Sequence, residues 1–306
     1  MIRGIRQDHP GLGLERCCRL LGLSRQAYYQ HFRDLQADAL GHELAIREVL
    51  SIRALQPAIG GRKLHAMLAP FLLAHRIKVG RDGLFDLLAA HGLLIKRKRR
   101  RAATTFSGHW LRRYPNLIRD RAPTGPNQIW VSDITYYMTA TGFVYISFIT
   151  DAYSRKIMGY HVADTLESVH TLEALKLAVE GCGPIKGLTH HSDRGVQYCS
   201  AAYVGFLLEN GIAISMTENG DPLENAIAER LNGIMKAEFL DHHRLGGLSD
   251  VASVLRESVT TYNTLRPHMS CAMHTPEKVH AESLEVERKW KNYYPKKTNF
   301  VNLSQD

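Results

Sequence analysis

Apolar residues in the first third of the chain recur at the spacing of a helix. Within residues 10–34 they lie three or four positions apart, until Gly22 interrupts the pattern and Ser24 is placed to cap a second short helix. The apolar positions of the first helix are Leu14, Cys17, Cys18 and Leu21. A helix, a glycine turn and a capped helix predict a helix-turn-helix, and an ordinary helical hairpin fits the same pattern.

Residues 42–95 continue at helical spacing and predict a second helical unit, punctuated by Gly60-Gly61 and Gly92. This unit leads into six adjacent cations, Lys96, Arg97, Lys98, Arg99, Arg100 and Arg101. Such a run repels itself and cannot be buried, so it is either a solvated linker or an arm that contacts phosphates. Residues 102–127 contain three prolines and predict a loop or domain boundary.

From residue 128 the pattern changes to runs rich in β-branched and aromatic residues, separated by short turns. Three runs, 128–138, 143–150 and 155–162, predict an antiparallel meander. Helical and strand patterns then alternate: a helix at 166–180, strands at 187–191 and 212–217 on either side of a helix at 201–210, and a long helix from Asp221-Pro222 to about 240. This order predicts the α/β class, with a mixed sheet and helices packed on it.

Charge is distributed unevenly along the 306 residues, whose formal net charge is +9. Residues 1–119 hold 22 Lys and Arg against 8 Asp and Glu, whereas the remaining residues hold 17 against 22. A basic N-terminal part joined to a mildly acidic part indicates a polyanion-binding region attached to a different activity. Hydrophobic residues make up 44% and charged residues 23%, which excludes a disordered or disulfide-stapled chain.

The five cysteines form no CxxC pair, and their odd number is no disulfide framework, so we expect a reducing cytoplasm. The first 15 residues lack the apolar centre of a signal peptide. The longest nearly apolar stretch, 66–74, is too short to cross a bilayer, so we expect no membrane association.

Three acidic residues are notable for their expected positions. Asp133 lies inside the first predicted strand, where an unpaired charge is costly. Asp193 follows the strand at 187–191, and Glu229 lies on the long helix. Carboxylates at the ends of different elements can hold two divalent cations, and hard oxygen ligands suit Mg²⁺ or Mn²⁺. Taken singly, each acid fits a surface or capping role better than a ligand role.

The long helix is expected to present Asn225, Glu229, Asn232 and Lys236 on one face, because they are spaced four, three and four residues apart. Its expected start has a capping pattern, with Asp221 at the N-cap and Glu224 three positions later. Glu224 therefore has a structural role and is the weaker candidate for the third acid.

Several segments carry a resemblance to a known family. Between Asp193 and Glu229 lie 35 residues. The segments that resemble the family are Pro126–Thr135, Gly142–Ile146, Thr150–Gly159, His191–Tyr198, Asn225–Glu229, Tyr262–His268 with Thr275-Pro276, and upstream Cys18–Tyr29, Gly60–Leu64 and Ala90–Leu94. They resemble the integrase-type transposases of bacterial insertion sequences, specifically the second-reading-frame product of the IS-three group.

The resemblance implies a ribonuclease-H-like mixed-sheet catalytic core preceded by small all-α, helix-turn-helix-like DNA-binding units. It implies a DDE transposase that cleaves DNA at 3′ ends with water and then joins the freed 3′-hydroxyl to a target. Asp133, Asp193 and Glu229 would be the catalytic residues and the ligands of two Mg²⁺ or Mn²⁺ ions. We expect Asn225 and His191 to hold these acids in position without binding the metal ions themselves.

The expected partners are double-stranded DNA, both element ends and target, and further copies of the chain assembled on that DNA. Members of this family are often fused by frameshifting to an upstream product, so an upstream-frame protein is a further expected partner. The expected place is the bacterial cytoplasm, at the nucleoid. For DNA contacts we expect Arg81, the run from Lys96 to Arg101, and Lys236, for which a purely solvated role is equally compatible.

These expectations divide the chain into a helix-turn-helix-like unit (1–38), a helical DNA-binding domain with its basic arm (42–101), a linker (102–122), the catalytic core (123–245) and a C-terminal helical segment and tail (246–306). Two other functions remain open. A DNA-binding regulator with an inactive core would explain the basic region and leave the three acids unexplained. A nuclease for RNA–DNA hybrids would share the core and not the N-terminal units.

Overall fold

The computed structural model describes residues 1–95, 111–119, 121–183, 185–218 and 225–286. The chain divides into two compact units, each with its own hydrophobic core. The first comprises Met1–Ala102 together with Ala237–His242, and the second comprises Ala103–Lys236 together with His243–Asp306.

The N-terminal part of the first unit is helical, as its apolar spacing predicts. Its helices are α1 (Ile2–Asp8), α2 (Leu14–Leu20), α3 (Arg25–Leu55), α4 (Gly61–Ala74) and α5 (Arg81–Ala90). Gly22 follows α2 with a φ of +67°, and the Ala27 N–H donates to Ser24 Oγ at 3.0 Å where α3 begins. The predicted glycine turn and serine cap are therefore confirmed. Helix α1 has no counterpart in the sequence prediction.

One helix, α3, runs through the boundary expected between segments 1–38 and 42–101. The expectation of a second short helix ending within residues 10–34 was therefore wrong. The reason is local: no proline lies between Arg25 and Leu55, and the single Gly41 costs only about 1 kcal/mol in a helix. Gly41 also gives room for packing, because a Cβ there would meet Ile77 Cγ2 at 3.3 Å.

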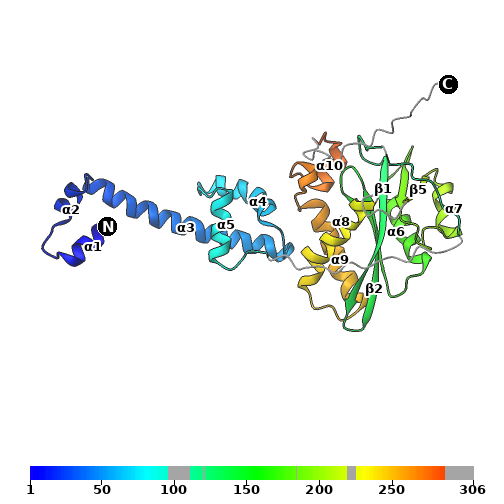
Figure 1. Ribbon diagram of the computed structural model, residues 1–306, viewed down its shortest axis with the longest axis horizontal. Helices are drawn as coiled ribbons and strands as arrows, with labels where there is room; N and C mark the ends of the chain where they lie inside the picture. The colour runs from blue at the N-terminus through cyan, green and yellow to red at the C-terminus, as the bar shows by residue number, and fades with distance from the viewer. Residues whose placement is uncertain (96–110, 120, 184, 219–224, 287–306) are drawn as a thin grey trace, which may run out of the picture. The chain divides into compact units, whose positions relative to one another are not determined.

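The two ends of α3 carry separate clusters of apolar side chains. At its N-terminal end, α1 and α2 enclose Ile2, Cys17 and Cys18 (Figure 1). Its C-terminal half packs against α4 and α5. The buried members of that second cluster are Ala45, Val49, Ile59, Leu64, Leu68, Leu72, Leu84 and Leu88.

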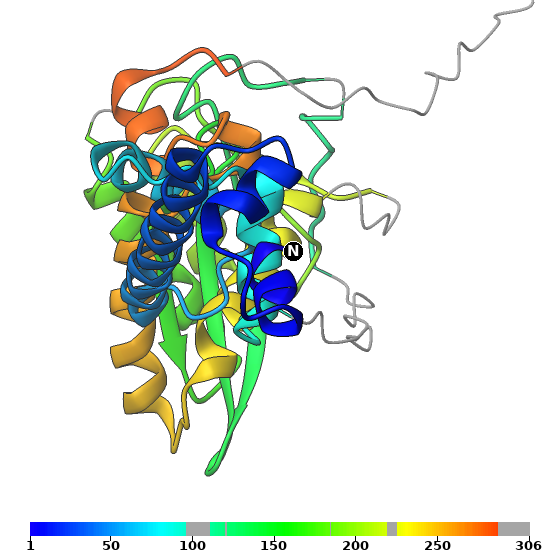
Figure 2. The ribbon, with the colours of Figure 1, turned by 90° about the vertical axis from the view of Figure 1, so that its left-hand side faces the viewer.

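The second unit is built on a five-stranded sheet in the order β3-β2-β1-β4-β5. Its strands are β1 (Ile129–Thr139), β2 (Gly142–Asp151), β3 (Ile157–Ala163), β4 (Thr189–Ser192) and β5 (Ala213–Met216). β1, β2 and β3 pair antiparallel, whereas β4 is parallel to both β1 and β5. β1 and β2 form a long hairpin that extends beyond the other strands (Figures 1 and 2). The predicted meander and mixed sheet are confirmed.

Helices cover both faces of this sheet, because successive residues of a strand point to opposite sides. Trp130 packs into a cluster with the helices α6 (Ser168–Glu180) and α7 (Ala201–Glu209). Its neighbours Ile129 and Val131 pack on the other face against Ala228 of α8 (Ala226–Ile234). The described chain continues with α9 (Leu248–Thr264) and α10 (Pro276–Glu282), so the α/β class with a preceding helical unit is confirmed.

Helix α8 begins at Ala226, with Asn225 as its N-cap, and not at Pro222 as expected. The Asn225 side chain donates to the Ser132 carbonyl at 3.0 Å, so a tertiary contact with β1 fixes the chain where the helix starts. The expected capping residues Asp221 and Glu224 lie outside the described residues. After Ile234 the chain continues as a π-helical turn, Met235–Phe239, and a short 3-10 turn, Leu240–His242.

Candidate active site

Asp133 of β1 and Asp193, which directly follows β4, lie at the same level of the sheet. The parallel pairing of β1 with β4 matches Trp130 to His190 and Val131 to His191. Asp133 and Asp193 each follow the last of these pairs by two residues. The sheet therefore brings together two acids that are far apart in the sequence, at the carboxyl end of β4.

Local hydrogen bonds fix the orientation of both carboxylates. Asp133 Oδ1 accepts the Ile134 N–H at 3.0 Å, and its Oδ2 accepts from Asn232 Nδ2 at 2.8 Å. Asp193 Oδ1 accepts the Gly195 N–H at 2.9 Å. A side chain at Gly195 would place its Cβ 3.0 Å from that same oxygen, so the close turn favours glycine.

Helix α8 presents Glu229 beside these two acids. Three of the four residues expected on one helix face contact β1: Asn225 through the Ser132 carbonyl, Asn232 through Asp133, and Lys236 with its Nζ 4.8 Å from the centre of the Tyr136 ring. Glu229 is exposed and lies on the same face, between the two asparagines. The predicted face is therefore the one that faces β1, the central strand of the sheet.

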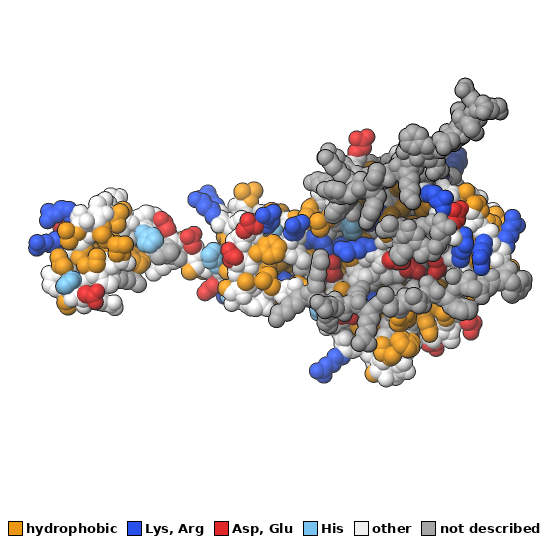
Figure 3. Space-filling view, in the orientation of Figure 1, with side chains coloured by type: hydrophobic (Ala, Val, Ile, Leu, Met, Phe, Trp, Pro, Cys, Tyr) orange, Lys and Arg blue, Asp and Glu red, His pale blue; other side chains and the backbone are white. Residues whose placement is uncertain are grey.

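The three carboxylates repel one another. Burial, and after it the charge of Asp193, raises the pKa of Asp133 to about 7, and Glu229 adds to that effect. Burial and the charge of Asp193 also raise the pKa of Glu229. Acidic side chains gather on the face of this unit seen in Figure 3, with basic side chains around them. Such a cluster is stabilised either by protons or by cations.

The donor atoms of this cluster are carboxylate oxygens, which suit a hard divalent cation such as Mg²⁺ or Mn²⁺. Within the described ranges, no group of three or more His, Cys, Asp and Glu side chains is arranged to hold a metal ion as it stands. The chemistry of the donor set and the mutual repulsion of the acids fit a cation.

The two residues expected to support the acids contact different elements of the second unit. Asn225 joins α8 to β1, as described. His191 is buried, and its Nδ1 lies 2.8 Å from Ser215 Oγ on β5. Asn232, which contacts Asp133 directly, was placed on the right helix face by the sequence, but its role was missed. Its spacing of three residues from Glu229 was the available signal.

The expected DNA contacts are only partly described. Arg81 is exposed, and its Nε forms an ion pair of 2.8 Å with the neighbouring Asp82. Lys236 lies over the Tyr136 ring. The run from Lys96 to Arg101 lies outside the described residues.

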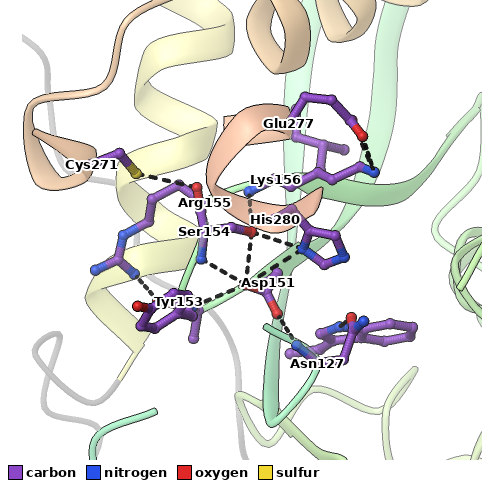
Figure 4. Close-up of polar contacts among 12 residues, drawn as sticks. Asn127, Asp151, Tyr153, Ser154, Arg155, Lys156, Cys271, Glu277 and His280 are labelled. Atoms are coloured by element: carbon purple, nitrogen blue, oxygen red, sulfur yellow. Dashed lines mark hydrogen bonds and ion pairs between the residues drawn. The ribbon is translucent and has the colours of Figure 1, made fainter. Parts of the chain in front are cut away.

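Asp151 is a buried acid whose hydrogen bonds assign it to the turn that follows β2 (Figure 4). Its Oδ2 accepts the Asn127 N–H at 2.7 Å. Its Oδ1 accepts from the Tyr153 N–H and from both the N–H and the hydroxyl of Ser154. Ser154 Oγ in turn lies 3.0 Å from His280 Nδ1 of α10. Asp151 thus holds the turn and fastens α10, and is not a fourth acid of the cluster.

The segment Tyr262–His268 fastens the end of α9 to the sheet. Asn263 accepts the Ile157 N–H through Oδ1 and donates to the Ile157 carbonyl through Nδ2, both at 2.9 Å. Arg266 is 1% exposed and lies against the Tyr262 ring. This segment, one of those that resemble the family, therefore has a structural role.

Comparison with known proteins agrees with this architecture. An integrase core domain family model matches residues 123–222, which include Asp133 and Asp193. A second integrase core domain model matches residues 210–276, which include Glu229. A 31 kDa protein of the insertion element IS600 from Shigella sonnei is 36% identical over 256 residues, covering 82% of this chain and 92% of the relative. The transposase InsF of insertion sequence IS3A from Escherichia coli K12 is 30% identical over 199 residues, covering 64% of this chain and 69% of the relative.

The chain belongs to the IS-three group of insertion-sequence transposases, with an integrase-like core. This confirms the expected family, and the sheet order with helices on both faces confirms the expected core of this transposase. The catalytic core domain of the HTLV-2 integrase, whose structure was solved in complex with magnesium, is 23% identical with a TM-score of 0.42, covering 51% of this chain and 97% of that one. In the described part of the transposase, no helix is long and apolar enough to cross a membrane.

Proposed function

We propose that this transposase cleaves DNA at 3′ ends and transfers the freed strand, with Asp133, Asp193 and Glu229 holding two divalent cations. The observation that carries the proposal is the carboxylate cluster itself. Burial raises the pKa of both Asp133 and Glu229, and the charge of Asp193 raises both further, so acids from β1, from the end of β4 and from α8 lie close enough to repel one another. Clusters of this kind are costly to stability and are typical of functional sites.

The side chains around the acids have defined tasks in this proposal. Asn232 and the Ile134 N–H each hold one oxygen of Asp133 and thereby fix the orientation of that carboxylate. The Gly195 N–H does the same for Asp193. Asn225 anchors the start of α8 and thereby sets the position of Glu229 along β1. His191, two residues before Asp193, is held by its contact with Ser215 of β5.

When bound, a pair of divalent cations would supply an activated oxygen nucleophile and would stabilise the leaving oxygen at phosphorus. Both steps are in-line displacements at a phosphodiester, first by water and then by the freed 3′-hydroxyl. The bond broken in the first step releases that hydroxyl, and the second step breaks a target phosphodiester as the new one forms. No covalent intermediate with a protein side chain is required.

Joining two element ends to a target requires more than one active site, so we propose that copies of the chain assemble on double-stranded DNA. The basic first third of the chain, including Arg81 and the run from Lys96 to Arg101, would contact phosphates, with Lys236 doing so next to the acids. An upstream-frame protein is a further proposed partner for recognising the ends.

The test is cleavage and joining of DNA that carries the element's own ends, with Mg²⁺ or Mn²⁺, in the wild type, in Glu229→Gln and in a matched control, Glu257→Gln. Glu257 is an exposed acid of α9 outside the cluster. We expect activity in the wild type and the control, and loss in Glu229→Gln with DNA binding intact. Equal activity in Glu229→Gln would remove this residue from the site. Tight DNA binding without cleavage or joining by the wild type or either variant would favour a DNA-binding regulator with an inactive core.

A further inference from the structure

A second site lies beside α8, lined by residues that the proposed mechanism does not use. It is a pocket of about 140 Å³, partly open to solvent, between the end of β2, helix α8 and the segment that follows α9. Its polar lining includes Thr150, Arg155, Arg230 and His268, and its apolar wall includes Ile227 and Ile234.

The charge of this pocket is positive. Arg155 and Arg230 bring two guanidinium groups, and the described residues that line the pocket include no Asp or Glu. The Ser270 N–H donates to His268 Nδ1 at 3.2 Å, so the neutral ring carries its proton on Nε2. Figure 4 shows Arg155 extending from the turn that Asp151 holds, and its guanidinium donates to the Ala152 carbonyl at 2.6 Å. A guanidinium has five N–H donors in a planar fork, which suits it to oxyanions.

A buried hydroxyl of the lining points to a missing acceptor. Thr150 is 1% exposed, and within the described part of the chain its Oγ1 has no hydrogen-bond partner. Buried hydroxyls are normally paired, because leaving one unpaired in an apolar surrounding is unfavourable. An oxyanion in the pocket would accept from this hydroxyl and from the cations around it.

We propose that this pocket binds a phosphate group and, resting on the function proposed above, that the phosphate belongs to the backbone of bound DNA. Arg230 follows Glu229 directly, so the two side chains project from α8 roughly 100° apart around the helix axis. The helix that carries the third acid would therefore hold a DNA phosphate on its adjacent flank. A tetrahedral oxyanion fits both the size of the pocket and its mixture of guanidinium and hydroxyl donors.

The first measurement uses inorganic phosphate and no DNA. Saturable binding is followed by the thermal shift of the full chain at constant ionic strength, with chloride in place of phosphate as the reference. The variants are Thr150→Val, which keeps the branched shape and removes the hydroxyl, and Arg230→Gln. The matched control is Arg244→Gln, an exposed arginine of the same unit that does not line the pocket.

We expect phosphate to bind the wild type and Arg244→Gln equally, and both pocket variants about tenfold more weakly, since charge-assisted hydrogen bonds are lost. Thr150→Val should melt at the same temperature as the wild type or higher without phosphate, because it removes an unpaired hydroxyl. Equal phosphate affinity in all four proteins, or no saturable binding to any of them, would overturn the proposal.

The second measurement identifies the source of the phosphate. The affinity for duplex DNA is measured over a range of salt concentrations, and Arg230→Gln should reduce the slope of log K against log salt by about 0.9, whereas Arg244→Gln should leave it unchanged. Weaker phosphate binding with an unchanged DNA slope would overturn the assignment to DNA and would assign the pocket to a free phosphate compound. Neither measurement requires cleavage activity, so failure of the proposed catalysis would be recognised separately, through Glu229→Gln.

Discussion

Asn232 of α8 donates a hydrogen bond of 2.8 Å to Asp133 of β1, and so links the helix that carries one acid to the strand that carries another. Residues that orient metal ligands from outside commonly contribute 10- to 100-fold to metal affinity or activity. Asn232→Ala should therefore lower cleavage activity by about that factor and raise the Mg²⁺ concentration needed for half-maximal rate, while DNA affinity stays the same.

The control for this experiment is Asn210→Ala, which removes an asparagine that donates to the Phe206 carbonyl at the end of α7. It should leave the metal requirement unchanged. If Asn232→Ala kept the wild-type Mg²⁺ dependence, the hydrogen bond would hold α8 in place without supporting a metal site.

Asp133 makes the metal-free protein less stable at alkaline pH. Its pKa is raised to about 7 in the folded chain, mainly by burial, so the folded state binds the proton more tightly than the unfolded state does. The stability that protonated Asp133 contributes is fully present below about pH 4 and is lost as the pH rises through about 7. Asp133→Asn should raise the free energy of unfolding in metal-free buffer at pH 8, by up to about 4 kcal/mol.

Chemical denaturation in EDTA at pH 5 and pH 8 measures this difference. Mg²⁺ should stabilise the wild type at pH 8 and have little effect on Asp133→Asn. A variant that is no more stable than the wild type at pH 8 would contradict the raised pKa of Asp133 in the folded chain.

His190 should make the fold sensitive to acid. It is buried, its Nε2 lies 3.0 Å from the Tyr203 hydroxyl, and burial followed by the charge of His191 lowers its pKa to about 3. The neutral ring contributes stability that is present above about pH 6.5 and is lost as the pH falls toward 3. His190→Gln keeps a polar group near Tyr203 and cannot titrate.

The free energy of unfolding of the wild type should therefore fall with decreasing pH more steeply than that of His190→Gln, by about 1.4 kcal/mol per pH unit between pH 6 and pH 4. Urea denaturation at several pH values provides the comparison. Parallel pH profiles for the two proteins would show that His190 accepts a proton without cost to the fold.

Gly159 is required for the contact between β3 and α6. A Cβ there would lie 2.2 Å from the Ala174 carbonyl oxygen, which belongs to helix backbone and cannot move aside cheaply. Gly159→Ala should destabilise the second unit by at least about 3 kcal/mol or prevent folding. Gly205→Ala on α7 is the matched control, because nothing lies within 4 Å of its Cβ position, and it should stabilise the helix by about 1 kcal/mol. Thermal unfolding of both variants tests the pair, and equal melting temperatures would refute the prediction.

The basic run should dominate the salt dependence of DNA binding. Replacing Lys96 to Arg101 with glutamine should reduce the slope of log K against log salt by up to about 5, because each phosphate contact releases a counterion. Binding isotherms on duplex DNA between 50 and 200 mM salt, roughly the range over which such contacts weaken strongly, measure the slope. An unchanged slope would assign the run to a linker.

The alternation of apolar residues in strands and their spacing in helices predicted the elements of the second unit well. Both patterns arise because one face of each element is buried. The meander followed from the β-branched runs around Asp133, and the face of α8 followed from the spacing between Asn225 and Lys236. The spacing of residues along the chain does not indicate which other element a helix or strand face packs against. The contact of Asn232 with Asp133, the start of α8 at Ala226 and the length of α3 all depend on tertiary packing.

The acids themselves were found through the order of the elements and the 35 residues between Asp193 and Glu229. Their closeness depends on the parallel pairing of β1 with β4, which no local pattern specifies. The pocket beside α8 could not be found from the sequence, because Thr150, Arg230 and His268 belong to segments that are brought together only by the fold.

Asn263 affects more than the attachment of α9. β3 is an edge strand of the sheet, and the Asn263 amide occupies both backbone hydrogen-bonding groups of Ile157 at its beginning. A side chain thus stands where a strand from another molecule would otherwise pair. This amide therefore closes the start of the β3 edge to the intermolecular strand pairing that leads to aggregation.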